Sequence, residues 1–379
     1  MKVLFDVSYL QPEMTGYGRA TREFLRALVE EQEAVDVLPF GWSMALDRSG
    51  IHALHPGAQN AFLAPVPGDI RRWYFQHCRW PSLERIVRMP YDLFQGMEPF
   101  IPPSRKPSVA VVHDFEVLRF PSSFPMKMHA WGRLVLAGIK RADAVIVPSQ
   151  FVLSQMTEFA PDAVQKTIVV PWAVSPVFSS WRVPSDHATL QQVGIVQPYL
   201  LFVGTIEPRK NLPLLLNALS VMLERNADCP MLVVVGNKGW DWHDTFRLME
   251  ELQRKGKLIY AGGVTDEVLS SLYRLAVATV VPSRCEGFGI PVIEAMACGC
   301  PVVSNKGSAL EEVGKSSAMT VDVHDVDQFV RALESVVSDT KLRSRMSRNG
   351  LARAAEFTHA RMARLALELY DAFMGPRAA

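Results

Sequence analysis

The sequence predicts an α/β protein with two domains, each built around a doubly wound parallel sheet. The chain has 379 residues, enough for two separate hydrophobic cores, and 49% of them are hydrophobic, as is typical of globular proteins. Short apolar, β-branched runs alternate with longer amphipathic stretches along the chain. Such runs, separated by helical patterns, indicate a parallel sheet that helices cover on both faces. Ligands of such sheets bind beyond the carboxyl ends of the strands, so the residues that follow each strand are candidates for function.

Charge and cysteine content narrow the classes of partner and compartment. The formal net charge is +1, so nothing in the bulk electrostatics points to nucleic acid. The five cysteines lack C-x-x-C spacing and indicate reduced, mostly buried thiols of a cytosolic protein. The pair Cys298-x-Cys300 does not have zinc-site spacing, and we expect neither a metal nor another cofactor.

The N-terminus, MKVLFDVSYL, is predicted to form a strand, because it lacks the extended apolar run and the cleavage site of a signal peptide. No segment reaches the roughly 20 apolar residues that a membrane-spanning helix needs. We therefore expect a cytoplasmic protein whose contact with a membrane, if it makes one, is peripheral.

A glycine-bearing loop follows the first predicted strand. In residues 12–21, Gly16-x-Gly18 opens a helix that extends to about residue 33. A lone pair of glycines can simply make a tight turn. The place between a strand and a helix also suits a phosphate or a sugar, so Gly16 and Gly18 are candidate backbone contacts to a ligand. The predicted strands of this half are 2–8, 34–40, 91–96, 108–113, 144–148 and 167–170.

Residues 69–90 combine basic and aromatic side chains, and two interpretations stay open. The combination suits an interface with anionic lipid headgroups. It also fits an ordinary amphipathic helix whose aromatic residues lie in the core. The residues concerned are Arg71, Arg72, Arg79, Arg85 and Arg88 together with Trp73, Tyr74, Phe75 and Trp80.

The strand at 108–113 ends in His113, which Asp114 follows. A histidine at the end of a buried parallel strand lies where ligands bind, although it could also be a satisfied histidine at the domain surface. Asp114 either orients the imidazole or caps the following turn.

A stretch that carries several prolines and serines, residues 175–198, separates the two halves. We predict a first domain at 1–178, a linker at 179–197 and a second domain at 198–355.

In the second domain, Arg209 and Lys210 follow the first predicted strand and stand beside the start of a helix. Arginine offers paired planar donors and lysine a mobile point charge, a combination that suits a diphosphate. The predicted strands of this half are 199–206, 231–237, 257–264, 278–281 and 301–307.

The most informative stretch is 280–301, VVPSRCEGFGIPVIEAMACGCP, which joins a buried strand to a helix through a polar turn. Glu286 lies in the turn and Glu294 in the helix, and a hydrophobic core needs neither carboxylate there. The glycines of the turn allow a ligand to approach the backbone closely. Pro291 fits the first turn of the helix, whose N-terminus is a ready site for an anion.

These residues resemble the signature of the retaining nucleotide-sugar glycosyltransferases with the GT-B fold, the large family 4 or group 1 type. The signature has two glutamates with seven residues between them, in the pattern S-x-x-E-G-F-G-x-P-x-x-E-A-M-A-x-G-x-P-V. A second family element, G-x-x-x-x-x-K-N-[LI], matches at Gly204, Lys210, Asn211 and Leu212. The matches to the signature are Ser283, Glu286, Gly287, Phe288, Gly289, Pro291, Glu294, Ala295, Met296, Ala297, Gly299, Pro301 and Val302.

The resemblance implies two Rossmann-like domains that face each other across a cleft. The first would bind the acceptor and the second the nucleotide sugar. Residues 356–379 would form a helix that packs back on the first domain.

The resemblance also assigns roles to individual residues. Arg209 and Lys210 would neutralise the donor diphosphate, and Glu294 would accept hydrogen bonds from the ribose hydroxyls. Glu286 would bind the transferred sugar, either as a nucleophile or, as we favour, as a positioning group. Further contacts would come from His113 near the donor sugar and from Gly16, Gly18, Gly204, Phe288, Gly289 and Ile290.

The implied reaction is transfer of a hexose with retention of anomeric configuration and without a metal. The SYL…TGYGR and VVHD segments resemble bacterial mannosyl- and rhamnosyltransferases of surface-polysaccharide synthesis. We therefore predict GDP-mannose or a GDP-deoxyhexose such as GDP-rhamnose as donor. The predicted acceptor is a saccharide, linked to undecaprenyl diphosphate at the cytoplasmic membrane face, in the synthesis of O-antigen or exopolysaccharide.

Other functions stay in view. A UDP-sugar-dependent transferase of the same fold is the alternative donor class. A non-hydrolysing sugar-nucleotide epimerase shares the architecture, but the paired glutamates argue against it. A non-catalytic partner subunit of a transferase is the third possibility. Asp325-x-Asp327 matches the metal-binding D-x-D of a different glycosyltransferase architecture only superficially, and we interpret Asp325 as a helix N-cap.

Overall fold

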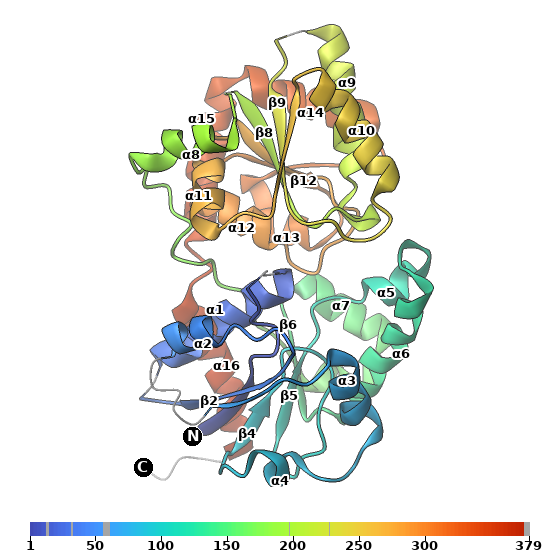
Figure 1. Cartoon of the computed structure of the whole chain (residues 1–379), viewed down its shortest axis with the longest axis vertical. Coiled ribbons are helices and arrows are strands. Elements are labelled where there is room, and N and C mark those ends of the chain that lie inside the picture. Colours follow the sequence, from blue (N-terminus) through green and yellow to red (C-terminus); the bar gives the residue numbers. More distant parts are fainter. Residues whose placement is uncertain (13–14, 32, 56–60, 197, 227, 375–379) are drawn as a thin grey trace. The chain divides into compact units, whose positions relative to one another are not determined.

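The computed structural model describes residues 1–12, 15–31, 33–55, 61–196, 198–226 and 228–374, which form two compact units (Figure 1). The first unit comprises Met1–Ala173 and Phe357–Ala379, and the second comprises Val174–Glu356. Some predicted positions lie outside the described residues: 13 and 14 of the glycine loop, 32 of the helix that follows it, 56–60 of the first domain, 197 of the linker, 227 of the second domain and 375–379 of the last segment.

The first unit contains a seven-stranded sheet in which all neighbouring strands are parallel. The chain order reverses between the first and the fourth strand, as expected of a doubly wound sheet. From one edge to the other, the strands are β3 (Phe62–Ala64), β2 (Asp36–Trp42), β1 (Lys2–Asp6), β4 (Leu93–Gln95), β5 (Ser108–Val111), β6 (Ala144–Val147) and β7 (Thr167–Val169).

Helices cover both faces of this sheet, because its strands are apolar on both sides. One core joins Leu4 and Phe94 of the strands to side chains of α3, α4, α6 and α7. On the other face, Phe24 of α1 packs edge-to-face on Phe5 of β1, and α16 lies against α1. The helices are α1 (Gly16–Glu30), α2 (Arg48–Leu54), α3 (Gly68–His77), α4 (Leu83–Val87), α5 (Glu116–Arg119), α6 (Met126–Arg141), α7 (Gln150–Phe159) and α16 (His359–Met374).

The last helix, α16, returns to the first unit and is fixed there by buried polar contacts. His359 Nε2 lies 2.8 Å from a carboxylate oxygen of Glu23 on α1. The hydroxyl of Tyr370 donates to Gln95 of β4 over 2.7 Å, and both side chains are fully buried. A helix that contributes such groups to the core is part of this unit and not a loose tail.

The second unit repeats the plan with a six-stranded parallel sheet, again with a reversal of chain order, here between β8 and β11. The predicted class, α/β with two doubly wound parallel sheets, is thus confirmed. From edge to edge, the strands are β10 (Leu258–Gly262), β9 (Met231–Val235), β8 (Tyr199–Val203), β11 (Ala278–Val281), β12 (Val302–Asn305) and β13 (Met319–Val321).

The helices of the second unit form two layers (Figure 1). Side chains of α9, α10 and α14 share one core with Leu200 and Phe202 of β8. The helices α11, α12 and α13 form the other layer, and α12 contacts both of its neighbours. Each of the three connects two parallel strands, and right-handed crossovers place them on that face of the sheet. The bounds are α8 (Ser185–Val193), α9 (Leu212–Arg225), α10 (His243–Arg254), α11 (Asp266–Leu275), α12 (Ile290–Ala297), α13 (Ala309–Gly314), α14 (Val326–Ser338) and α15 (Thr340–Ala354).

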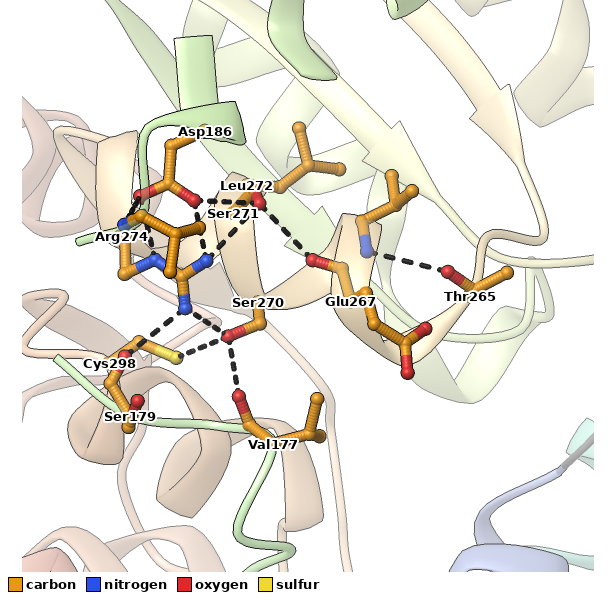
Figure 2. A network of polar contacts seen from close by, with 12 residues as sticks. Val177, Ser179, Asp186, Thr265, Glu267, Ser270, Ser271, Leu272, Arg274 and Cys298 are labelled. Carbon is orange, nitrogen blue, oxygen red and sulfur yellow. Dashed lines mark hydrogen bonds and ion pairs between the residues drawn. The ribbon is translucent and has the colours of Figure 1, made fainter. Parts of the chain in front are cut away.

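Residues 174–196, which we call the strap, belong to the second unit and include most of the predicted linker. The strap contains α8, and Asp186 at its start accepts two hydrogen bonds from Arg274 of α11, at 2.9 and 2.5 Å (Figure 2). Both side chains are buried, with 2% and 6% of their surfaces exposed. The strap is therefore attached to α11 by a bidentate ion pair between Arg274 and Asp186.

Several local predictions are confirmed by the structure. Asp325 caps α14, because its carboxylate accepts a hydrogen bond from the Gln328 amide over 2.9 Å. Pro291 lies in the first turn of α12. The five cysteines are free thiols, and all except Cys78 are buried.

The structure divides the basic and aromatic stretch at 69–90. Tyr74 and Phe75 of α3 lie in the core, as the amphipathic interpretation requires, and the lipid interpretation was wrong for them and for buried Arg71. Trp73 and Trp80, by contrast, are 58% and 71% exposed. Among the described residues, no helix is long and apolar enough to cross a membrane.

Candidate active site

The reversal of strand order in the second unit determines which residues meet. The strands β8 and β11 are neighbours although 74 residues separate their ends at Val203 and Ala278. Because both strands are parallel, the segments that leave their carboxyl ends emerge side by side, where ligands of doubly wound sheets bind. The segment after β8 carries Arg209 and Lys210, and the segment after β11 carries Glu286.

These three side chains form one ion-pair cluster. Lys210 Nζ lies 2.5 Å from one carboxylate oxygen of Glu286, and Arg209 Nη1 lies 2.8 Å from the other. Arg209 also donates through Nε and Nη2 to Glu207, at 2.9 and 2.7 Å. The four side chains are between 4% and 19% exposed, so the charges interact in a partly desolvated setting.

The cluster separates the acidities of its two carboxylates. Burial favours the neutral form of Glu286, but the charges of Lys210 and Arg209 outweigh it and lower its pKa to about 2. Burial raises the pKa of Glu207 above its ordinary value, although Arg209 and Lys210 oppose the shift. Glu286 is therefore an anion at any physiological pH, and it holds both cations on one carboxylate.

Backbone contacts fix the two segments to each other. The amide of Arg284 donates to the carbonyl of Arg209 over 2.9 Å. The side chain of Asn305, at the end of the next strand, β12, donates to the carbonyls of Ser283 and Arg284, each over 3.0 Å. The loop that carries Glu286 is thus held on both sides.

Gly204 lies beside the cluster, in a backbone conformation with φ of +157°. A Cβ atom built on it would be 3.5 Å from the side chain of Lys210. Its carbonyl oxygen would be only 2.0 Å from a Cβ built on Gly236, at the end of β9. Two glycine backbones therefore pass each other at a distance that no other residue at position 236 would permit.

The helix α12 starts directly after the Glu286 loop. Gly289 is its N-cap and has φ of +107°, a conformation that favours glycine. Phe288 is buried, and Ile290 is the first residue of the helix. One turn on, Glu294 is 3% exposed and accepts a hydrogen bond from the hydroxyl of Tyr273 over 3.0 Å.

A second cluster lies in the first unit, at the carboxyl ends of β1, β4 and β5. The ring of His113 lies 4.0 Å from that of Tyr17, which stands between Gly16 and Gly18, and 5.4 Å from that of Trp172. The helix that begins at Gly16 is capped by Thr15, whose hydroxyl accepts from the Gly18 amide. The glycine loop and His113 are therefore neighbours within this unit.

The imidazole of His113 is set in one tautomer. Its Nε2 lies 3.0 Å from the carbonyl oxygen of Met97, so Nε2 carries the proton. Burial lowers the pKa of His113 to about 4, and the ring is neutral near pH 7. In this state Nδ1 can accept a hydrogen bond. Asp114 accepts from the Glu116 amide over 3.2 Å, as a turn cap does.

A buried ion pair lies next to this second cluster. Arg71 of α3 donates to Glu98 over 2.6 Å, and neither side chain is more than 3% exposed. The hydroxyl of Tyr9 also bonds to Glu98, and the ring of Tyr9 lies 5.4 Å from that of Tyr17. Arg71, which the sequence grouped with surface residues, is an interior residue.

The structure brings Arg209, Lys210, Glu286 and Gly204 together in one unit, with the Phe288–Ile290 segment and Glu294 on the adjoining loop and helix. It brings Gly16, Gly18 and His113 together in the other. The roles assigned to these residues stay predictions. The sequence analysis missed Glu207, Asn305 and Tyr273, of which only Glu207 had a local signal, as an acidic residue beside two basic ones at a strand end. Among the described residues, no group of three or more His, Cys, Asp or Glu side chains could hold a metal ion.

Comparison with known proteins gives the family. The model of the glycosyl transferases group 1 matches residues 191–353, and the model of glycosyltransferase family 4 matches residues 14–177. The two matches cover complementary parts of the chain, and each contains most of one unit.

Individual relatives agree with these models. The O-antigen chain mannosyltransferase B of Escherichia coli is 27% identical over 368 residues, which cover 94% of this chain and 96% of that protein. The serotype-specific mannosyltransferase WbdA of Escherichia coli is 30% identical over 238 residues, 62% of this chain but only 29% of that protein. The structure of sucrose-phosphate synthase from Thermosynechococcus elongatus superimposes with a TM-score of 0.77 over 99% of both chains, at 16% identity. The chain therefore belongs to the group 1 and family 4 glycosyltransferases and is an enzyme of the GT-B fold.

Proposed function

We propose that this glycosyltransferase moves mannose from GDP-mannose to a saccharide acceptor during O-antigen synthesis. The observation that supports it most is the similarity to an O-antigen chain mannosyltransferase, which extends over 94% of the chain and includes both units. The cluster of Arg209, Lys210 and Glu286 supplies the chemistry that a nucleotide-sugar donor requires. GDP-rhamnose and other GDP-deoxyhexoses fit the same site chemistry and are part of the test below.

The donor diphosphate would bind at Arg209 and Lys210. In the structure these two cations are balanced by Glu207 and Glu286. An incoming diphosphate competes with Glu286 for them, because it offers more negative charge and more acceptor oxygens. The N-terminus of α12 adds partial positive charge close by. As the sugar departs, charge accumulates on the diphosphate, and each preorganised contact of this kind contributes about 2.7–4 kcal/mol to the transition state.

Displacement from the cations would free the carboxylate of Glu286 to bind hydroxyls of the sugar. A charged hydrogen-bond acceptor such as this carboxylate would hold the sugar in one orientation. Holding the reacting groups in the right geometry lowers the barrier to transfer. The bond between the anomeric carbon and the phosphate oxygen breaks, and a bond from the same carbon to the acceptor oxygen forms on the same face. The acceptor proton passes to the departing phosphate oxygen, so no group of the protein has to be consumed, and no metal is required.

The acceptor is proposed to be a saccharide on a lipid diphosphate carrier. In the first unit, neutral His113 offers Nδ1 as a hydrogen-bond acceptor to a hydroxyl of the donor sugar, and the glycine loop lies next to it. Exposed Trp73 and Trp80, with nearby arginines in the sequence, fit a peripheral contact with anionic lipid.

The test is a transfer assay with a mannosylated, lipid-linked acceptor and a panel of donors: GDP-mannose, GDP-rhamnose, UDP-glucose and UDP-galactose, each with EDTA. We expect product from GDP-mannose, with the α-linkage of the donor retained in the NMR spectrum of the product. Product from a UDP sugar alone would overturn the donor assignment. An inverted linkage would overturn the mechanism, and loss of activity with EDTA would overturn metal independence.

A further inference from the structure

We propose that Tyr273 is a positioning residue for the donor ribose: its hydroxyl holds Glu294 in the orientation that receives the ribose hydroxyls. The inference deepens the proposed function, because it rests on the donor binding beside α12. It concerns a residue of α11 that has no part in the family signature.

The geometry of the pair is that of a carboxylate with one oxygen fixed. Tyr273 is completely buried, and its hydroxyl donates to Oε2 of Glu294 over 3.0 Å. Glu294 itself is 3% exposed, so its carboxylate has little water to replace a lost partner. A hydrogen bond to one oxygen fixes the plane of the carboxylate and thereby the direction of the lone pairs on the other.

Several contacts hold Tyr273 and its helix against the strap. The ring of Tyr273 packs edge-to-face on Phe178 of the strap, with ring centroids 5.8 Å apart. The same helix, α11, carries Arg274 and Ser271, which bond to Asp186, and Ser270, whose hydroxyl donates to the carbonyl of Val177 over 2.9 Å (Figure 2). Three residues of α11, Ser270, Ser271 and Arg274, thus bind the strap. Tyr273 of the same helix directs its hydroxyl to Glu294.

Contacts between α11 and α12 complete the arrangement. Ser270 Oγ lies 3.7 Å from Sγ of Cys298, at the end of α12 (Figure 2). The two helices are therefore fixed to each other one turn below the Tyr273 hydroxyl. Packing alone does not require a phenol to be held in one orientation. A hydroxyl that orients a ligand-binding carboxylate does require it, and the contacts of α11 provide that support.

A matched pair of variants separates positioning from simple stability. Tyr273→Phe removes the hydroxyl on Glu294 and keeps the ring. Tyr199→Phe is the control, because Tyr199 is also completely buried and its hydroxyl donates to α11 as well, to the carbonyl of Leu272 over 2.7 Å. Each variant loses one buried hydrogen bond, so we expect similar decreases in Tm.

The readout is the ratio of the Kd values for 2′,3′-dideoxy-GDP and GDP, measured by calorimetry on the full chain. The wild type should prefer GDP on the order of tenfold or more, as expected for hydrogen bonds between a carboxylate and hydroxyls. Tyr273→Phe should lower this preference at least about threefold, mainly by weakening GDP binding, whereas Tyr199→Phe should leave it unchanged.

The outcomes distinguish the two proposals. An unchanged preference in Tyr273→Phe, with the wild type still discriminating, would overturn the positioning role and leave the donor site intact. Equal loss of preference in both variants would show a general effect of α11 and would also overturn it. A wild type that binds GDP without regard to the ribose hydroxyls, or that binds no nucleotide, would overturn this inference, and the second result would overturn the proposed donor site as well.

Discussion

Glu286 pairs with two cations, one on each carboxylate oxygen. Under the proposed function, this single residue affects nucleotide binding and catalysis differently. The carboxylate contacts Arg209 and Lys210, the two residues to which we propose that the donor diphosphate binds. In the proposed donor complex it contacts the sugar instead. Removing its charge should therefore have opposite effects on the two steps.

We expect Glu286→Gln to bind GDP at least as tightly as the wild type, because a like-charged competitor has been removed while the shape is kept. Transfer should fall by about 10²–10³ in kcat, the size typical of one lost electrostatic contact in a transition state. Calorimetry with GDP and the transfer assay give the two values. Weaker GDP binding together with an unchanged kcat would contradict the role assigned to Glu286.

The lowered pKa of His113 makes a prediction about stability. The ordinary value for the unfolded chain is 6.5 and the folded value is about 4, so between these values the unfolded state binds the extra proton. Stability is therefore lost as the pH falls from 6.5 through 4. The corresponding loss for Glu286, whose pKa is lowered from 4.5 to about 2, begins only as the pH falls through about 4.5.

Urea unfolding at pH 7 and pH 5 tests this prediction. The wild type should lose roughly 1–2 kcal/mol more than His113→Gln over this interval, because only the wild type carries the buried imidazole. All other histidines are common to both proteins and serve as the internal control. Equal losses would show that the ring is not protected from protonation.

At the level of elements, the backbones of Gly204 and Gly236 cross in close contact. This crossing allows the loop after β8, which carries Arg209 and Lys210, to take its observed path. The carbonyl of Gly204 lies where the Cβ of a side chain at position 236 would be, and the two glycines directly follow the neighbouring strands β8 and β9. Because the two backbones can approach so closely, β8 and β9 stay paired up to the point where the chain leaves each strand.

Gly236→Ala should destabilise the second unit by about 3 kcal/mol, since it combines a clash of backbone and Cβ with a φ of +139°. Gly256→Ala is the control: Gly256 has φ of +67° but nothing within 4 Å of a Cβ, so we expect about 1 kcal/mol from conformation alone. Thermal and urea unfolding measure both. A cost for Gly236→Ala no larger than that of Gly256→Ala would refute the crossing.

Sequence patterns predicted the central elements better than the edges. The buried strands were found because their apolar runs are nearly continuous, and the loop and helix of α12 because Gly289 and Pro291 mark them. The three-residue strands β3 and β13 were missed, whereas β7, an edge strand of the same length, was found because its run of Thr, Ile and Val is β-branched throughout. The boundaries of the strap were missed for a different reason: its prolines indicate a linker, while its attachment depends on Arg274, far along the chain.

The same contrast holds for the site. Arg209, Lys210 and Glu286 stand out locally because charge at the end of a buried strand is unusual. Tyr273, Asn305 and Tyr17 look like ordinary helix, strand or loop residues, and only the fold shows which groups they touch. Arg71 was grouped with exposed arginines, because no local pattern reveals that it pairs with Glu98 in the interior.

For the molecule as a whole, the exposed tryptophans of the first unit raise the question of where the enzyme works. Trp73 and Trp80 are large apolar side chains that are exposed to solvent, which is energetically unfavourable, and the sequence around them is basic. The proposed lipid-linked acceptor would bring this unit close to a membrane surface.

We expect Trp73→Ala combined with Trp80→Ala to weaken sedimentation with vesicles that contain phosphatidylglycerol and to leave Tm unchanged. Trp181→Ala is the control, since Trp181 is 78% exposed but belongs to the second unit. Equal vesicle binding by all three proteins would show that these side chains make no membrane contact.

The most direct test of the donor site is calorimetric binding of GDP, UDP, ADP and dTDP, with EDTA, to three proteins. These are the wild type, the double variant Arg209→Ala with Lys210→Ala, and the control Lys255→Ala, whose lysine forms an exposed ion pair with Glu251. We predict that GDP binds most tightly to the wild type and to the control, and that the double variant loses at least about 100-fold in affinity, as two lost charged contacts imply. Undiminished GDP binding by the double variant, or tighter binding of UDP by the wild type, would contradict the account.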